Sequence, residues 1–277
     1  KQEVFYQDKK TKKPPRLIVF PSLEFRVVEK MAFGDPSRVP KAVLGAAYGF
    51  QYTPFERVKV LIDMWKSKRN PCAIVVDAKC FDSSITPGDV ERETELYCAA
   101  YRDTALIRAI SKHYAHGPMV NNRGVWVGER NCRASGVLTT SSSNCLTCYL
   151  KVKAATRKVK LKNASLLIHG DDCIIICERE LPDDICDQLR DALLAYGYDC
   201  EPSVHSSLDT AVTCSTFLAE CRVHGGARVN FLSTDMRRAL ARACGGYGDG
   251  AACAAGYTIQ YPHHPITRYV LIPLLLG

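Results

Sequence analysis

The amino-acid sequence predicts an α+β fold in which helices pack against a mostly antiparallel sheet. Short runs rich in β-branched residues, such as residues 72–76, alternate with longer segments of helical apolar spacing, such as residues 54–65. Residues 164–177 carry two apolar runs on either side of a Gly-Asp-Asp tripeptide, which is the pattern of a β-hairpin with a tight turn. The chain has 277 residues, 47% of them hydrophobic, which is enough for a large core in one or two domains.

The remaining elements follow from apolar spacing and from turn residues. We expect helices at residues 23–31, 54–65, 87–101, 104–114, 143–158, 182–196 and 235–243, and again at the C-terminal end. We expect strands in two short runs within residues 1–20, at residues 72–76, in a hairpin over residues 121–130, and at residues 208–218 and 228–232. The turn Gly225-Gly226 joins the last two strands. Without an internal repeat, this mixture predicts the α+β class.

The charge pattern indicates a polyanionic partner. The formal net charge is +8, and basic residues gather near residues 9–16, 66–69 and 151–162. Clusters of this kind suit nucleic acid. The alternative for each cluster is a set of solvated surface lysines.

The cysteines and the chain ends further restrict the class of protein to which the chain can belong. Fourteen cysteines are scattered through apolar runs, and only Cys145 and Cys148 have CxxC spacing, so we interpret them as reduced core thiols of a cytosolic protein. The chain opens without a signal peptide or a Met, and the apolar tail at residues 269–276 is too short to span a bilayer. We expect an internal piece of a larger protein.

Three aspartates are the candidate catalytic and metal-binding residues. Asp77 ends the buried strand at residues 72–76, and Asp171 and Asp172 lie in the turn of the hairpin. Buried unpaired carboxylates are costly, so these side chains need cations if their strands are neighbours. Two divalent ions held there can activate a hydroxyl for phosphoryl transfer, and oxygen ligands favour Mg²⁺ or Mn²⁺. The alternative is an exposed turn with two solvated acids. His169 adjoins the pair, but a lone histidine is more often a packing residue, and we do not predict a ligand there.

The order and spacing of the polar motifs resemble a known family. Asp77-x4-Asp82, then Ser135-Gly136-x3-Thr140-x3-Asn144, then Gly170-Asp171-Asp172 are similar to the palm motifs of viral RNA-dependent RNA polymerases. The resemblance is strongest to polymerases of the hepatitis C virus and pegivirus (GB virus) type. It is carried by RLIVFP at residues 16–21, EKMA at 29–32, YGFQY at 48–52, CRASGVLTTS at 132–141 and TCYLK at 147–151, and it weakens after about Arg179.

The resemblance implies a right-hand polymerase fold and a set of site residues. The implied domains are fingers at residues 1–46, palm at 47–84, fingers at 85–139, palm at 140–218 and the start of the thumb at 219–277. Asp77 and Asp171 are implied to ligate two metal ions, with Asp172 in a secondary role. The implied nucleotide-binding residues are Lys1, Lys13 and Arg16 for the triphosphate and Asp82, Ser135, Thr140 and Asn144 for the ribose. The implied primer and RNA contacts are Cys214, Ser215 and Lys151, with core packing as the alternative for Cys214.

The implied reaction is template-directed attack of an RNA 3′-hydroxyl on an NTP. The implied partners are template RNA, nascent RNA, NTPs, other viral replication proteins and, indirectly, a host membrane. The implied location is a replication complex on the cytoplasmic face of endoplasmic-reticulum-derived membranes in the host cytoplasm. We expect residues 1–277 in isolation to polymerise weakly or not at all.

Two other classes stay open, and some residues depart from the hepatitis C pattern. A reverse transcriptase or DNA polymerase shares the carboxylates but not the hydroxyl-reading set at Ser135 and Asn144. A non-catalytic RNA-binding module needs the basic clusters only. Ser142 and Ser143 replace a Cys-Gly pair, and His169 replaces an asparagine. The general acid for pyrophosphate stays unassigned. Whether the chain comes from the hepacivirus or the pegivirus group also stays undecided.

Overall fold

The centre of the fold is a four-stranded antiparallel sheet with the strand order β4-β5-β1-β6. The computed structural model describes residues 18–222, 226–237, 240, 249–262 and 264–276. Within them the sheet consists of β1 (Pro71–Ala78), β4 (Ser165–His169), β5 (Asp172–Glu178) and β6 (Cys200–His205). The predicted strand at residues 72–76 and the predicted hairpin at residues 164–177 are both confirmed.

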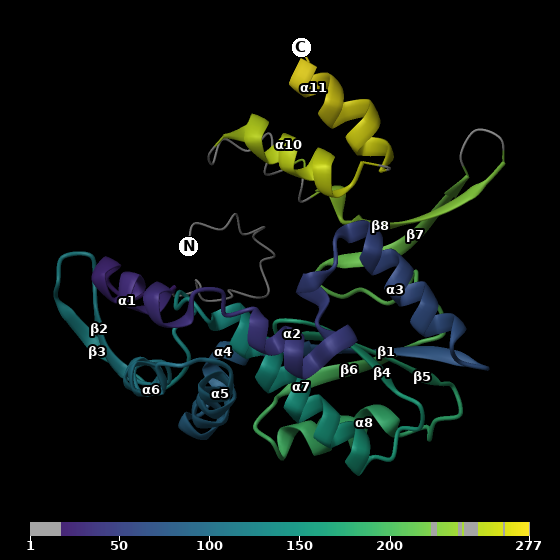
Figure 1. Ribbon diagram of the computed structural model, residues 1–277. Coiled ribbons are helices and arrows are strands. Elements are labelled where there is room, and N and C mark those ends of the chain that lie inside the picture. The colour runs from purple at the N-terminus through teal and green to yellow at the C-terminus, as the bar shows by residue number, and fades with distance from the viewer. Residues whose placement is uncertain (1–17, 223–225, 238–239, 241–248, 263, 277) are drawn as a thin grey trace, which may run out of the picture.

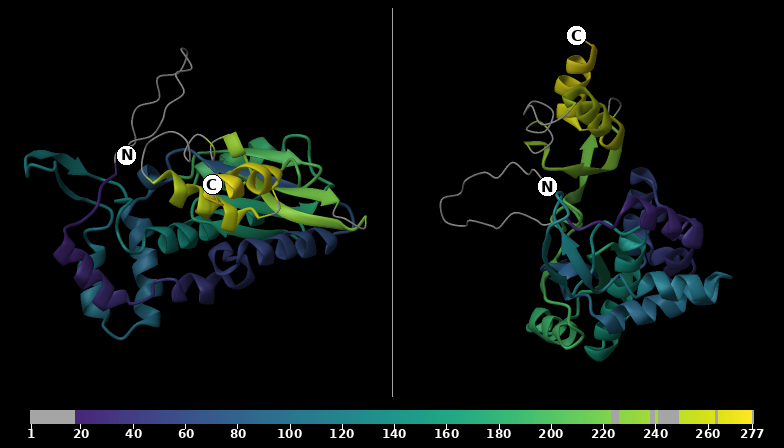
Figure 2. Two further views of the ribbon diagram at one scale, coloured as in Figure 1. Left: turned by 90° about the horizontal axis from the view of Figure 1, so that it is seen from above. Right: turned by 90° about the vertical axis from the view of Figure 1, so that its left-hand side faces the viewer.

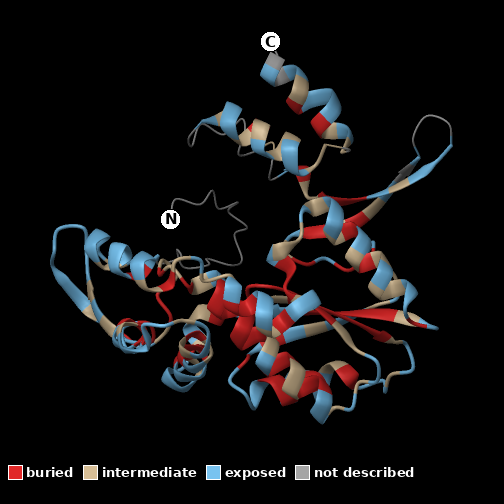
Figure 3. Ribbon diagram, viewed as in Figure 1, coloured by how far each residue is buried: buried red, intermediate tan, exposed pale blue. Residues whose placement is uncertain are grey.

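Helices and a second hairpin cover both faces of this sheet. On β1, Cys72, Ile74 and Val76 face a core that includes side chains of α2 (Arg38–Leu44), α7 (Thr140–Lys158) and α8 (Ile185–Leu194). Ala73 and Val75 point to the other face, where they meet α3 (Pro54–Lys66) and the hairpin of β7 (Thr216–Arg222) and β8 (Arg228–Thr234). Figures 1 and 3 show these layers and the continuous buried band along the strands. Because both faces are covered, the central strands are apolar without alternation.

A helical region extends from one side of the sheet (Figures 1 and 2). It contains α1 (Leu23–Phe33), α5 (Pro87–Ala100), α6 (Thr104–Ser111) and the hairpin of β2 (Gly117–Val120) and β3 (Trp126–Arg130). Both α3 and α5 begin with a proline and a capping box, made by Thr53 with Glu56 and by Thr86 with Asp89. The four helices predicted between residues 23 and 114 are confirmed.

Three predicted element boundaries were wrong, and one strand was missed. The hairpin expected over residues 121–130 has its first strand at Gly117–Val120. The strand expected at residues 208–218 begins only at Thr216, because residues 208–212 form turns and irregular structure. Strand β6 was not predicted, since it is an edge strand whose residues are mostly polar and exposed, and it contains Pro202. Helix α7 also begins at Thr140, before the expected residue 143.

The C-terminal part is helical, as predicted. It consists of α10 (Gly250–Gln260), a π-helical turn η3 (Thr267–Leu271) and α11 (Ile272–Leu276), and Met236, Ala254 and Leu271 form its small core. Figures 1 and 2 place these helices beyond the β7–β8 hairpin. Among the described helices, none has the length and apolarity that crossing a bilayer requires. The strands predicted within residues 1–17 and residues 238–239 and 241–243 of the predicted helix 235–243 lie outside the described residues.

Candidate active site

The three predicted catalytic aspartates meet at one end of the central sheet. Strands β1 and β5 are antiparallel neighbours, and the pairing of Val76 with Cys173 places Asp77 beside Asp172. The β4–β5 hairpin turns at Gly170 and Asp171, where Gly170 has a φ of 70°. A glycine adopts this left-handed conformation without the steric cost of a side chain. The expectation that these two strands are neighbours is therefore confirmed.

The electrostatics of the cluster favour a bound cation. Asp171 and Asp172 are half-buried, whereas Asp77 is exposed. Burial raises the pKa of Asp171, and the like charges of Asp172, Asp82 and Asp77 raise the pKa further. Burial also raises the pKa of Asp172, with Asp77 adding to the shift. A positive ion among these oxygens offsets their mutual repulsion.

The three carboxylates have the ligand chemistry that divalent ions prefer, but their side chains are not close enough together to form a metal site in this structure. Across the described part of the chain, no group of three or more His, Cys, Asp or Glu side chains is close enough to hold a metal ion. Asp77 is exposed and free of a packed environment, so its carboxylate can reorient. Hard oxygen ligands of this kind suit Mg²⁺ or Mn²⁺.

Asp82 and Asn144, both implied to bind the ribose, are in contact beside the acidic cluster. Asp82 lies in the short helix α4 (Phe81–Ser84), just after Cys80 in the left-handed region with a φ of 51°. The Nδ2 of Asn144 donates to the Oδ1 of Asp82 over 2.8 Å. The Oδ1 of Asn144 is buried without a hydrogen-bond partner. An unsatisfied buried acceptor of this kind is uncommon in a folded protein.

The loop before α7 carries Ser135 and Thr140. The hydroxyl of Thr140 donates to the carbonyls of Val137 and Ala134, at 2.9 and 3.2 Å, and so holds the loop against the first turn of the helix. Ser135 is half-buried in the same loop. The backbone N–H of Gly136 donates to the carbonyl of Val19 over 2.9 Å. A Cβ at Gly136 would lie 2.5 Å from the Cβ of Phe20, so this close approach requires glycine.

Cys214 and Ser215 form a strained two-residue turn that touches the acidic cluster. Their φ angles are 49° and 58°, both in the left-handed region, and the N–H groups of Thr213 and Thr216 each donate to the other residue's carbonyl over 2.8 Å. This turn lies within residues 208–218, where the sequence predicts a continuous strand, so that part of the prediction is wrong. The sequence does not predict a further contact that the structure shows: the Sγ of Cys214 donates to the Oδ2 of Asp172 over 3.2 Å. Burial raises the pKa of the Cys214 thiol, which therefore stays a donor. No local sequence signal connects residues so far apart.

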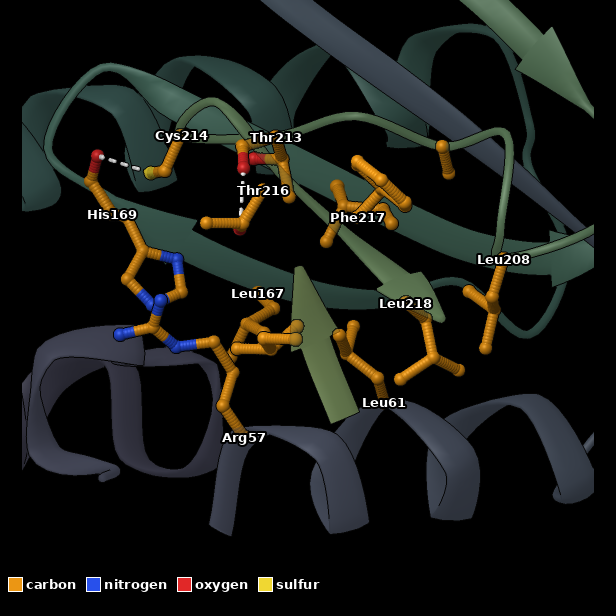
Figure 4. A pocket seen from close by; sticks show the side chains of 13 residues that line it. Arg57, Leu61, Leu167, His169, Leu208, Thr213, Cys214, Thr216, Phe217 and Leu218 are labelled. Carbon is orange, nitrogen blue, oxygen red and sulfur yellow. Dashed lines mark hydrogen bonds between the residues drawn. The ribbon is translucent and has the colours of Figure 1, made fainter. Parts of the chain in front are cut away.

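His169 packs behind the hairpin. The ring is buried, meets the ring of Phe50 edge-on at 5.5 Å, and lies so close to Gly49 that an added Cβ there would be 2.2 Å from it. Figure 4 shows it beside Arg57 in a small pocket that Thr213 and Cys214 also line. Burial, and then the charge of Arg57, lower the pKa of His169 to about 3. The side chain is neutral.

The predicted basic contacts are only partly placed by the structure. Lys151 is buried, with 7% of its side chain exposed, and its ammonium group pairs with Asp89 over 3.0 Å. Binding of RNA by Lys151 therefore requires that this ion pair opens. Lys1, Lys13 and Arg16 lie outside the described residues. The roles of all the predicted site residues stay predictions.

The antiparallel sheet brings three aspartates together at the ends of neighbouring strands, beside the Asp82–Asn144 pair. This arrangement defines a candidate site for phosphate-bearing substrates and divalent ions. A family model described as "Viral RNA dependent RNA polymerase" matches residues 1–275. The chain is 40% identical over 255 residues to a genome polyprotein of hepatitis C virus genotype 6a (isolate EUHK2). It is 41% identical over 255 residues to a genome polyprotein of genotype 1c (isolate HC-G9). Each match covers 88% of this chain and 8% of the polyprotein.

This chain belongs to the family of viral RNA-dependent RNA polymerases. The resemblance noted from the motifs is thereby confirmed. The chain spans only 8% of the length of the polyproteins that it matches. Proteins of this family generally use divalent metal ions.

Proposed function

We propose that the polymerase containing this chain is an RNA-directed RNA polymerase that adds NTPs to the 3′-hydroxyl of an RNA strand under the direction of a template. The observation that carries this proposal is the meeting of Asp77 with Asp171 and Asp172 at one end of an antiparallel sheet. Membership of the viral polymerase family supports the same reaction.

In this proposal Asp77, Asp171 and Asp172 hold two Mg²⁺ or Mn²⁺ ions. Such a pair of ions activates an attacking hydroxyl and stabilises the leaving oxygen of a phosphoryl transfer. The protein contributes position: the β1–β5 pairing fixes Asp77 against Asp172, and the tight turn at Gly170 fixes Asp171. The raised pKa values of Asp171 and Asp172 support this role, since a cation returns them to the ionised form.

Asp82 and Asn144 are proposed to select ribonucleotides. The unpartnered, buried Oδ1 of Asn144 can accept a hydrogen bond from a 2′-hydroxyl. A site that hydrogen-bonds a hydroxyl rejects the analogue without it, because its buried polar groups are then left unpaired. Ser135 and Thr140 are proposed to complete this set, and Lys1, Lys13 and Arg16 to contact the triphosphate.

The proposed RNA contacts are Cys214 and Ser215 for the primer strand and Lys151 for template phosphate. Other viral replication proteins and, indirectly, a host membrane are the proposed partners of the whole polymerase. The proposed location is a replication complex on the cytoplasmic face of endoplasmic-reticulum-derived membranes. Residues 1–277 alone are expected to polymerise weakly or not at all.

The test measures incorporation of labelled NTPs and dNTPs by the whole polymerase on an RNA template with Mg²⁺, Mn²⁺ or EDTA. We expect metal-dependent incorporation of NTPs, its loss in Asp77→Asn, and full retention in Asp63→Asn. Asp63 is a matched control because it is an exposed aspartate of α3. A wild-type rate of NTP incorporation by Asp77→Asn refutes the proposed site. RNA binding without incorporation in the wild type favours a binding module, and a preference for dNTPs favours a DNA polymerase.

A further inference from the structure

Helices α5 and α7 are joined by three polar side-chain pairs at regular intervals. On each helix the three residues are four positions apart, so they lie along one face. The paired positions rise along α5 as they fall along α7, so the two helices run antiparallel along this row. The pairs are Asp89 with Lys151, Glu93 with Thr147 and Tyr97 with Ser143. The outer pairs have distances of 3.0 and 3.3 Å.

Glu93 of the middle pair also forms a buried ion pair with Arg133. The NH2 group of Arg133 donates to the Oε1 of Glu93 over 2.5 Å, and the Thr147 hydroxyl donates to the same oxygen. Glu93, Arg133 and Thr147 are 2%, 2% and 3% exposed. The Oε2 of Glu93 and the Nε and NH1 of Arg133 are buried without a hydrogen-bond partner. Apolar residues of similar volume often stabilise a core as well as such a pair does. Stability alone therefore gives a weak reason for these charges.

The position of the Glu93–Arg133 ion pair in the fold gives a stronger reason for charged residues at this buried place. The backbone N–H of Arg133 donates to the carbonyl of Asp82 over 3.0 Å. The side chain of Asp82 accepts from Asn144 over 2.8 Å, and Asn144 precedes Thr147 by one turn of α7. The contacts therefore form a closed circuit that runs from Asp82 through Asn144, Thr147, Glu93 and Arg133 back to Asp82. In a closed circuit, a shift of α7 or of the Arg133 loop changes the contact between Asp82 and Asn144.

We propose that Glu93 and Arg133 are positioning residues that set the Asp82–Asn144 contact and thereby the discrimination between ribonucleotides and 2′-deoxyribonucleotides. This inference rests on the proposed ribose-reading role of Asp82 and Asn144. Neither Glu93 nor Arg133 touches the substrate. Both act through the helix and the loop that carry the reading groups.

The experiment compares nucleotide discrimination in the whole polymerase. The readout is the ratio of kcat/KM for an NTP to kcat/KM for the matching dNTP. We expect Glu93→Gln and Arg133→Gln each to lower this ratio by about tenfold, through a higher KM for the NTP, because small misplacements of a reading group are costly. The double variant is expected to be no worse than the worse single variant, since both residues act as one unit.

Variants at two further positions keep the test independent of folding. Thr147→Val removes only the hydroxyl that Glu93 accepts from, and we expect a several-fold lower ratio, while Thr147→Ser retains the wild-type ratio. Lys68→Met is the matched structural control. It removes a buried ammonium group that donates to Asn163 and Ser165 at 3.2 and 2.9 Å, at the end of the hairpin away from Gly170. A folding defect lowers the rates with both nucleotides equally, so Lys68→Met should leave the ratio unchanged.

Asn144→Ala separates this inference from the function on which it rests. A lowered ratio in Asn144→Ala, with wild-type ratios in the Glu93, Arg133 and Thr147 variants, overturns the positioning role and leaves the ribose site standing. A wild-type ratio in Asn144→Ala refutes the ribose site itself, and the positioning role falls with it.

Discussion

Replacing Gly136 by alanine should destabilise the protein, because the added methyl group meets backbone. Its carbon would lie 2.5 Å from the Cβ of Phe20 and 2.9 Å from both the Cα of Phe20 and the carbonyl oxygen of Val19. Two of these three atoms belong to the main chain and cannot turn away as a side chain can. Overpacking of this kind costs about 1–3 kcal/mol. Loss of the hydrogen bond between the Gly136 N–H and the Val19 carbonyl adds about 1 kcal/mol. The expected destabilisation is therefore about 2–4 kcal/mol.

The same substitution at Gly88 is the matched control. An added Cβ there meets only the Oγ1 of Thr86, at 3.8 Å, and the residue lies in the first turn of α5, where alanine is as good or better. Urea denaturation followed by tryptophan fluorescence measures both variants. A loss of about 3 kcal/mol corresponds to a fall of about 1 M in the urea midpoint. We also expect a higher KM for NTPs in Gly136→Ala, because the loop carries Ser135. A midpoint equal to that of Gly88→Ala would refute the steric argument.

Two other predictions concern groups next to the catalytic hairpin. His169 has a pKa of about 3 in the folded protein, against about 6.5 when unfolded, so its contribution to stability is lost as the pH falls between these values. Between pH 7 and pH 5 the wild type should lose about 2 kcal/mol more than His169→Gln in urea denaturation, and parallel pH profiles would contradict the buried neutral ring. Cys214→Ala removes the donor to Asp172 and should lower the rate of NTP incorporation several-fold, whereas Cys214→Ser should retain it. Equal rates in all three proteins would show that the thiol does not position Asp172.

Three strands of the central sheet and most helices could be predicted because their signals are local. Two apolar runs around a Gly-Asp-Asp turn define the β4–β5 hairpin, and proline followed by helical spacing defines α3 and α5. Strand β6 carries no such signal, since an edge strand with alternating exposed polar residues has a sequence like that of a loop. The sequence of residues 208–218 predicts a continuous strand, although the chain there turns tightly at Cys214 and Ser215.

Only the site residues that belong to the sequence motifs could be predicted. Asp77, Asp82, Asn144, Asp171 and Asp172 are found together as the motif order implies. Glu93 belongs to a charged stretch, ERETE at residues 91–95, that is typical of a solvated helix, and only the packing of α5 on α7 reveals its burial. Lys151 shows the reverse case, because a lysine in a basic cluster proves to be a buried ion-pair partner. Side-chain partners far apart in sequence are set by tertiary packing, which the local pattern does not encode.

The measurement that tests the account most directly counts the metal ions bound at the acidic cluster. Electron paramagnetic resonance can titrate Mn²⁺ into the whole polymerase with template RNA and a non-hydrolysable NTP. Asp183→Asn is the control, since Asp183 is exposed and its charge is not among those that raise the pKa of Asp171 or Asp172. We expect two ions per molecule in the wild type and in Asp183→Asn, and weaker binding of at most one ion in Asp171→Asn. Two ions bound with unchanged affinity in Asp171→Asn would contradict the assignment of Asp77, Asp171 and Asp172 as one cation site.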